Sequence, residues 1–392
     1  MPQEDRWLLP EGVEEVLPPC AGRVETLRRR ILDLLHSWGY ELVIPPLIEY
    51  LDSLLTGMGH DLDLQTFKLT DPLSGRLMGV RADMTPQVAR IDARRIQCDT
   101  ATRLCYLGPV LQTYPSSLGS SRNPFQIGAE LFGHHGIESD VEVLCLMIET
   151  LRLAGIAPIY VDLGHMAVFH GLTRAIPLSP EQEEALFQLL QRKAHAEIRS
   201  QLQAWGIEAE PSARIRALAE LDGDEAILRT ARAVLCGAPA EVFAAIDELE
   251  RIARLVRLRS SGVRLHFDLA DLRGYHYHNG VMFAAYTPGQ GQALAKGGRY
   301  DDIGAVFGRP RAATGFSCDL KLLVDCAIGG TDDAQPVVSA AWSDDPSLHA
   351  AVAQLRSEGK RIAWDLPQAG TAHSGAGARL VWRDGQWVIA GD

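Results

Sequence analysis

Two polar side chains lie within an otherwise apolar segment, Phe125–Phe132, and their spacing suggests a binding function. Gln126 and Glu130 are four residues apart, and in a β-strand such residues point to the same face. Apolar neighbours suggest that this face points inward, where an unpaired carboxylate is costly. A bound cation or an imidazole N–H would satisfy Glu130. A structural salt bridge with Arg122 or Arg299 would satisfy it equally well, and the residues alone leave both possibilities open.

A second candidate is the short segment Arg81–Thr85, which precedes a predicted helix. An ammonium group needs hydrogen-bond acceptors, and the carboxylate of Asp83 beside the hydroxyl of Thr85 would supply two. The alternative is a local role, with Thr85 as the N-cap of a helix over 85–95 and Asp83 as a solvated acid that the helix dipole favours. This segment taken alone favours the local role.

The segment Leu272–His278 combines a guanidinium, phenols and imidazoles within seven residues. Arg273 could pair with a carboxylate through two hydrogen bonds, and Tyr277 could reach an imidazole nitrogen. A metal site is the alternative, because His276 and His278 would share one face of a strand. No third ligand occurs at a suitable spacing, so a pocket lining is favoured over a metal site.

The elements that must position these residues have a mixed α and β pattern. Helical spacing of apolar residues predicts a helix over 20–38, and the strand after it ends at Pro45–Pro46. Residues 66–82 are predicted to form a β-hairpin. Ser179 begins a capping box with proline at the first helical position, so we expect a helical insert over about 179–260.

Residues 329–335, with the sequence GGTDDAQ, have the composition of a linker. The residues beyond it are predicted to form a strand, a helix, a second strand and a hairpin. We therefore expect a main domain over 1–328 and a short C-terminal α/β domain over 329–392.

Composition limits the class of protein. The chain of 392 residues has a formal net charge of −12, which weighs against nucleic-acid binding by the whole surface. The seven cysteines form no C-x-x-C pair, which is typical of reduced thiols in a cytoplasmic protein. No apolar stretch is long enough to span a bilayer. We expect a soluble cytoplasmic protein without a metal or cofactor.

Several segments together resemble the histidyl-tRNA synthetases, a class II aminoacyl-tRNA synthetase family. The similar segments are residues 81–85, 104–133, 273–283, 297–301 and 314–323. The resemblance implies an α+β fold, in which a mixed, mainly antiparallel sheet is flanked by helices. It also implies a helical insert and a small C-terminal α/β domain like a truncated anticodon-binding domain.

The same resemblance implies a pocket for L-histidine. The implied ligand-binding residues are Asp83, Thr85, Gln126, Glu130, Arg273 and Tyr277, and weaker candidates are Arg122, His276 and His278. The α-amino group would lie near Asp83 and Thr85. The imidazole would lie near Glu130 and Tyr277, and the carboxylate near Arg273.

The nucleotide part of the family's site is replaced in this chain. At three positions where the family has phosphate-binding arginines, the aligned residues are Leu111, Ser120 and Leu322. A leucine side chain cannot donate a hydrogen bond to a phosphate. Since the loss of one preorganised donor lowers a rate by about a hundred- to a thousandfold, the loss of three should abolish adenylation.

A histidine pocket without an ATP clamp is similar to the regulatory subunits of ATP phosphoribosyltransferase. This resemblance implies a non-catalytic subunit needed for activity of the short-form catalytic subunit and for feedback inhibition by L-histidine, in the first step of histidine biosynthesis. It implies a dimer within a hetero-octamer, and no binding of tRNA or membrane.

Two other functions remain open from the residues. One is a true histidyl-tRNA synthetase, and the other is an amino-acid-activating enzyme derived from one. Both would need the ATP clamp, so exchange of pyrophosphate with ATP in the presence of histidine distinguishes them from a sensor.

Overall fold

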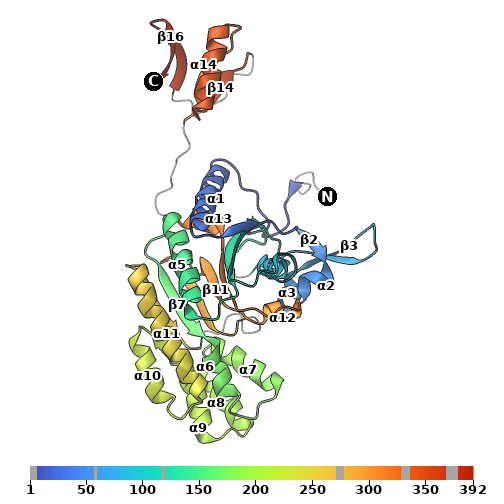
Figure 1. Ribbon diagram of the computed structural model, residues 1–392, viewed down its shortest axis with the longest axis vertical. Helices are drawn as coiled ribbons and strands as arrows, with labels where there is room; N and C mark the ends of the chain where they lie inside the picture. The colour runs from blue at the N-terminus through green and yellow to red at the C-terminus, as the bar shows by residue number, and fades with distance from the viewer. Residues whose placement is uncertain are drawn as a thin grey trace. The chain divides into compact units, whose positions relative to one another are not determined.

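The computed structural model describes residues 7–56, 60–115, 120–270, 278–327, 336–367 and 378–391. The chain divides into two compact units, one formed by residues 1–16 and 24–329 and the other by residues 17–23 and 330–392 (Figure 1). None of the helices in the described ranges is long and apolar enough to cross a membrane.

Within the described residues, the larger unit is built on a nine-stranded sheet in the order β1-β5-β6-β12-β11-β10-β7-β9-β8. In chain order the strands are β1 (Glu41–Val43), β5 (Thr102–Pro109), β6 (Phe125–Phe132), β7 (Tyr160–His165), β8 (Asp222–Gly223), β9 (Arg264–Asp268), β10 (Val281–Tyr286), β11 (Ala295–Arg299) and β12 (Ala313–Asp319). Neighbouring strands are antiparallel except for the pairs β1–β5 and β7–β9. The expected mixed, mainly antiparallel sheet is thereby confirmed.

Helices cover this sheet, and three further strands form a separate, smaller sheet. The helices are α1 (Cys20–Ser37), α2 (Leu51–Leu55), α3 (His60–Gln65), α4 (Thr85–Ile91), which continues as a π-helical turn over Asp92–Ile96, α5 (Ile137–Leu153), α12 (Ile303–Val306) and α13 (Leu320–Cys326). The second sheet is β2 (Ile48–Tyr50), β4 (Leu77–Val80) and β3 (Phe67–Thr70). The predicted helix over 20–38 and the hairpin over 66–82 are confirmed.

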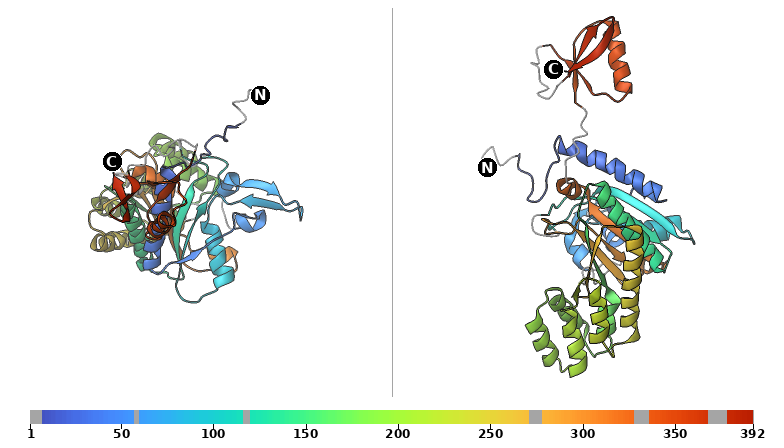
Figure 2. Two further views of the ribbon diagram at one scale, coloured as in Figure 1. Left: turned by 90° about the horizontal axis from the view of Figure 1, so that it is seen from above. Right: turned by 90° about the vertical axis from the view of Figure 1, so that its left-hand side faces the viewer.

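A group of helices follows β7 and lies at one end of the larger unit (Figures 1 and 2). Its members are α6 (Met166–Thr173), α7 (Pro180–Gln191), α8 (His195–Ala204), α9 (Ala209–Leu218), α10 (Ala226–Val234) and α11 (Ala240–Arg259). The predicted capping box is present, because Ser179 Oγ accepts a bond from the Gln182 backbone N–H at 3.3 Å and the Ser179 N–H donates to Gln182 Oε1 at 2.9 Å. Helix α11 packs against α5 and α6 and so joins these helices to the main sheet.

The smaller unit has its own sheet and core. Its strands, in the order β14-β13-β15-β16, are β14 (Ile362–Asp365), β13 (Val338–Ala341), β15 (Ala378–Arg383) and β16 (Gln386–Gly391). Helix α14 (Pro346–Ser357) buries Leu348 and Val352 against this sheet. The order strand, helix, strand and hairpin is the one that the sequence predicts.

Candidate functional site

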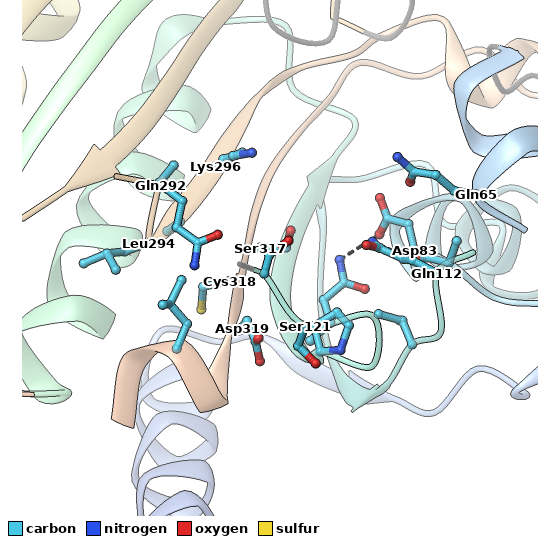
Figure 3. Close-up of a pocket in the computed structure, with 18 of the residues that line it drawn as sticks. Gln65, Asp83, Gln112, Ser121, Gln292, Leu294, Lys296, Ser317, Cys318 and Asp319 are labelled. Atoms are coloured by element: carbon cyan, nitrogen blue, oxygen red, sulfur yellow. Dashed lines mark hydrogen bonds between the residues drawn. The ribbon is translucent and has the colours of Figure 1, made fainter. Parts of the chain in front are cut away.

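A cavity of about 460 Å³ opens in the larger unit beside the main sheet. Its walls include parts of strands β6, β11 and β12, the segment before α4, the turn that precedes β6, and residues of α3 and α13. The lining residues with polar or charged side chains are Gln65, Asp83, Gln112, Ser120, Ser121, Gln126, Tyr286, Gln292, Lys296, Ser317 and Asp319. Figure 3 shows Gln65, Asp83 and Gln112 at one end and Gln292, Leu294 and Lys296 at the other.

Asp83 is held in a defined orientation at the cavity wall. Its Oδ1 atom accepts hydrogen bonds from Gln126 Nε2 at 2.8 Å and from the backbone N–H of Thr85 at 3.0 Å. Gln126 is fixed in turn, because its Oε1 accepts from the backbone N–H of Met84 at 3.0 Å. The structure therefore brings together two of the residues that sequence reasoning selected, and both line the cavity.

Glu130 does not line the cavity but lies buried among tyrosines. Its Oε1 accepts a hydrogen bond from Tyr106 at 3.0 Å, and its Oε2 accepts one from Tyr300. Burial raises the pKa of the Glu130 carboxyl from 4.5 to about 8, against the opposing effect of the two tyrosine hydrogen bonds. Burial therefore favours the protonated form of this carboxyl, since desolvation disfavours the charged form.

Thr85 is joined to Glu130 through the same tyrosine. Its Oγ1 lies 2.9 Å from the hydroxyl oxygen of Tyr106, and the side chain is buried. The alternative role of Thr85 as an N-cap is wrong, because the hydroxyl faces Tyr106 and makes no capping bond to the helix backbone. One buried hydrogen-bond network thus joins the side chains of Thr85, Tyr106, Glu130 and Tyr300.

Neither arginine that sequence reasoning paired with Glu130 contacts it. Arg299 donates to Asp140 Oδ2 through Nε at 3.1 Å and Nη2 at 2.7 Å. Arg122 donates to the backbone oxygens of Gln112 and Glu11 at 3.0 and 2.8 Å, and it is absent from the cavity lining. The alternative of a salt bridge is therefore wrong, because tyrosine hydroxyls, which carry no charge, satisfy the buried carboxyl instead.

His278 is the one described member of the histidine- and tyrosine-rich segment. Its Nδ1 lies 3.3 Å from the backbone oxygen of Arg299, and its ring meets that of Tyr300 edge to face at 6.4 Å. Burial lowers the pKa of His278 to about 4, so the ring is neutral at physiological pH. Arg273, His276 and Tyr277 lie outside the described residues, and their assignment stays a prediction.

The positions assigned to phosphate binding divide into two groups. Ser120 and Leu322 line the cavity, whereas Leu111 does not. Val110 and Gln112 on either side of Leu111 do line it, as expected where alternate residues of an extended segment share a face. Sequence reasoning missed Gln112, although this alternation was a signal that could have identified it.

The charges around the cavity do not favour a polyphosphate. Lys296 is the one basic side chain among the described lining residues, and it is accompanied by the acids Asp83 and Asp319. Phosphate groups are held in proteins by arginine forks or several donors. The cavity instead presents amide, hydroxyl and carboxylate groups, which suit a small polar ligand with an amino group.

Comparison with known proteins gives consistent results for both units. Residues 12–323 match the family described as histidyl-tRNA synthetase, and residues 335–390 match the ATP phosphoribosyltransferase subunit HisZ C-terminal domain. The ATP phosphoribosyltransferase regulatory subunit of Thioalkalivibrio sulfidiphilus is 55% identical over 392 residues, which cover 99% of each chain.

Solved structures show the same fold. An ATP phosphoribosyltransferase regulatory subunit/histidyl-tRNA synthetase from Bacillus halodurans aligns with a TM-score of 0.80 and 25% identity over 92% of each chain. A chain of the ATP phosphoribosyl transferase (HisG:HisZ) complex from Thermotoga maritima aligns with a TM-score of 0.59 at 20% identity, covering 76% of this chain and 97% of that chain.

Proposed function

The chain belongs to the family of ATP phosphoribosyltransferase regulatory subunits, and we propose that within that enzyme it is the sensor of L-histidine. In this proposal the cavity beside Asp83 holds the amino acid. Occupancy changes the activity of a short-form catalytic subunit, which carries the chemistry of the first step of histidine biosynthesis. A coupling free energy of roughly 1–3 kcal/mol between the two sites would be sufficient.

The observation that supports this proposal most strongly is the fixed carboxylate of Asp83. Gln126 and the backbone of Thr85 orient it before any ligand binds, and an amino acid brings an ammonium group that pairs with it. Because the orienting bonds already exist, little conformational entropy is lost when the ligand binds.

Glu130 is proposed to recognise the imidazole from behind the cavity. Its carboxyl and the hydroxyl of Tyr106 are hydrogen-bonded polar groups in largely apolar surroundings, and in this proposal side chains shift on ligand binding so that an imidazole nitrogen reaches them. Arg273 and Tyr277 remain the proposed partners of the ligand's carboxylate and imidazole, with His276 and His278 as further candidates.

We further propose that the chain does not activate amino acids. Ser120 and Leu322 line the cavity at positions assigned to phosphate contacts, and neither can form a bidentate pair with phosphate. The alternative, an amino-acid-activating enzyme derived from a histidyl-tRNA synthetase, predicts exchange of labelled pyrophosphate into ATP with histidine present. We expect no exchange above background.

Self-association is proposed to use the edge of the main sheet near β1. This strand stands at the end of the strand order. Leu42 within it and Ile44 directly after it are 49% and 80% exposed. An exposed apolar edge is a typical interaction surface. We expect a dimer by light scattering of the chain alone, a weaker dimer for Ile44→Asp, and a hetero-octamer with the catalytic subunit.

The decisive experiment is reconstitution with a short-form ATP phosphoribosyltransferase catalytic subunit. The rate with ATP and phosphoribosyl pyrophosphate should rise when the chain is added, and histidine should then inhibit the complex. Calorimetry with the chain alone should also detect the binding of histidine. A chain that binds histidine but changes neither rate nor inhibition would contradict the proposed function.

A further inference from the structure

Lys321, in the first turn of α13, carries an ammonium group that is buried and fully hydrogen-bonded. Its side chain is 9% exposed. Nζ donates to Glu14 Oε1 at 2.7 Å, to Ser121 Oγ at 3.1 Å and to Asn123 Oδ1 at 3.3 Å. Because an ammonium group has three N–H donors, these three oxygens satisfy it, and the loss of any one would leave a buried charge short of a partner.

The ammonium joins two segments that are far apart in the sequence. Glu14 belongs to the N-terminal segment over 11–14, whereas Ser121 and Asn123 belong to the turn that precedes β6. The Asn123 side chain connects the same segments again, because it accepts from the Glu14 N–H at 3.3 Å and donates to the Glu14 backbone oxygen at 3.1 Å. The Lys321 hydrogen bond also holds the pKa of the Glu14 carboxyl below its usual range.

Arg122 adds further bonds between the N-terminal segment and the turn. Its backbone N–H donates to the Gly12 oxygen at 2.7 Å, and its Nη1 donates to the Glu11 oxygen at 2.8 Å. Arg122 also holds the backbone of the cavity-lining Gln112, since the Gln112 N–H donates to the Arg122 oxygen at 2.8 Å and Arg122 Nε donates to the Gln112 oxygen at 3.0 Å. The N-terminal segment is therefore bonded directly to residues that shape the cavity.

The turn is part of the cavity wall, and the N-terminal segment supports it from outside the cavity. Ser121 and Asp319 both line the cavity (Figure 3). The Asp319 carboxylate accepts from the Lys321 backbone N–H at 3.1 Å, so Lys321 contacts lining residues through its backbone and through its side chain. No residue of 11–14 is among the described lining residues.

We propose that Lys321 is a positioning residue of the histidine site, which fixes the turn over 120–124 as a cavity wall and couples occupancy of the cavity to the N-terminal segment over 11–14. The inference rests on the proposed histidine-binding function. A ligand that packs against the turn needs the turn in one conformation, and ordering a loose turn on binding lowers affinity. Because coupling is reciprocal, a bound ligand must in turn stabilise the segment that is bonded to the turn.

The test uses the full-length chain, with calorimetry to measure histidine affinity and hydrogen exchange to measure protection of residues 11–14. Glu14→Gln keeps an oxygen for Lys321 but removes the negative charge, and Lys321→Met removes the ammonium. Glu15→Gln is the matched control, because it makes the same change at the next residue, which is also exposed.

Histidine should slow hydrogen exchange over 11–14 in the wild type and in Glu15→Gln, although this segment does not line the cavity. Glu14→Gln and Lys321→Met should lose most of this protection and should bind histidine at least about fivefold more weakly. Ser121→Ala added to Lys321→Met should weaken binding no further than Lys321→Met alone, because in this proposal Lys321 acts through the turn that carries Ser121.

Failure of the proposed function and failure of this inference give different results. If the wild-type chain does not bind histidine, the proposed function is wrong and the inference falls with it. If histidine binds but both variants match the wild type in affinity, or if histidine leaves exchange over 11–14 unchanged, the inference alone is overturned. Additive losses from Lys321→Met and Ser121→Ala would also overturn it. Should Lys321→Met fail to fold, the comparison of Glu14→Gln with Glu15→Gln decides, since the Glu14 side chain is 54% exposed.

Discussion

Tyr106 donates a hydrogen bond of 3.0 Å to Glu130, and both side chains are almost completely buried, at 0% and 1% exposure. The bond links the two strands β5 and β6 on the face that carries the site. It also joins the carboxyl to Thr85, which follows the cavity-lining Asp83 by two residues. The hydrogen bonds of Glu130 are therefore connected to the segment that carries Asp83.

The first prediction concerns stability and pH. Burial raises the folded-state pKa of Glu130 from 4.5 to about 8, so its stabilising effect is fully present below pH 4.5 and is lost as pH rises through 8. Glu130→Gln cannot ionise. Relative to the wild type, its free energy of unfolding should rise between pH 5 and pH 9, by at most about 5 kcal/mol.

Chemical denaturation at pH 5, 7 and 9 measures this difference. Glu208→Gln, which changes an exposed acid at the start of α9, is the matched control and should show no such trend. A constant difference between Glu130→Gln and the wild type across this range would mean that Glu130 is already ionised in the folded protein.

The second prediction concerns Gly315, which faces Glu130 across β12 and β6. A Cβ atom at this position would overlap Glu130 Oε2 and lie 2.8 Å from the Ala129 oxygen. Gly315→Ala should therefore destabilise the protein by more than about 3 kcal/mol or prevent folding, as expected for overpacking with loss of a buried network.

Thermal melting of Gly315→Ala, of Gly22→Ala and of the double variant Gly315→Ala with Glu130→Ala tests this prediction. Gly22→Ala in α1, where a Cβ atom would meet nothing within 4 Å, should be neutral or slightly stabilising. Adding Glu130→Ala to Gly315→Ala should recover part of the loss, because only the backbone contact with Ala129 would remain. A Gly315→Ala protein as stable as the wild type would mean that Glu130 can leave its site freely.

The elements of this fold are largely predictable from local patterns. Apolar periodicity identifies α1, and the capping box at Ser179 identifies the start of α7. The strand, helix and hairpin of the smaller unit follow from alternation and from the Asp384–Gly385 turn. Each of these signals lies within about 20 residues of sequence and needs no tertiary contact.

The partners inside the site are not predictable in the same way. The spacing of Gln126 and Glu130 indicates a shared inward face, but it does not identify the side chains that this face contacts. Tyr300 is 170 residues away from Glu130 in sequence, and the pairing depends on the order of strands across the sheet. Leu111 and Gln112 are likewise neighbours in sequence, yet only Gln112 lines the cavity, and this difference depends on how the extended segment is oriented.

The third prediction concerns nucleotide chemistry. Leu111→Arg with Leu322→Arg should not restore amino-acid activation, because residue 111 does not line the cavity and Ser120 still lacks a guanidinium. Pyrophosphate exchange should stay at background while the double variant remains folded by circular dichroism. Exchange well above that of the wild type would show that these two positions alone prevented activation.

The last prediction separates sensing from activation in the assembled enzyme. Asp83→Asn keeps the shape of the side chain and can still accept from the Thr85 N–H, but it removes the charge that pairs with an ammonium. A ligand shifts an equilibrium only by its differential affinity for the two states. The complex with a short-form catalytic subunit should therefore keep its rate with ATP and phosphoribosyl pyrophosphate, while half-inhibition needs at least about tenfold more histidine.

Glu130→Ala should act in the same direction if its proposed contact with the imidazole is correct. A parallel loss of rate and inhibition would indicate a broken interface, and unchanged inhibition would place the feedback site outside this cavity.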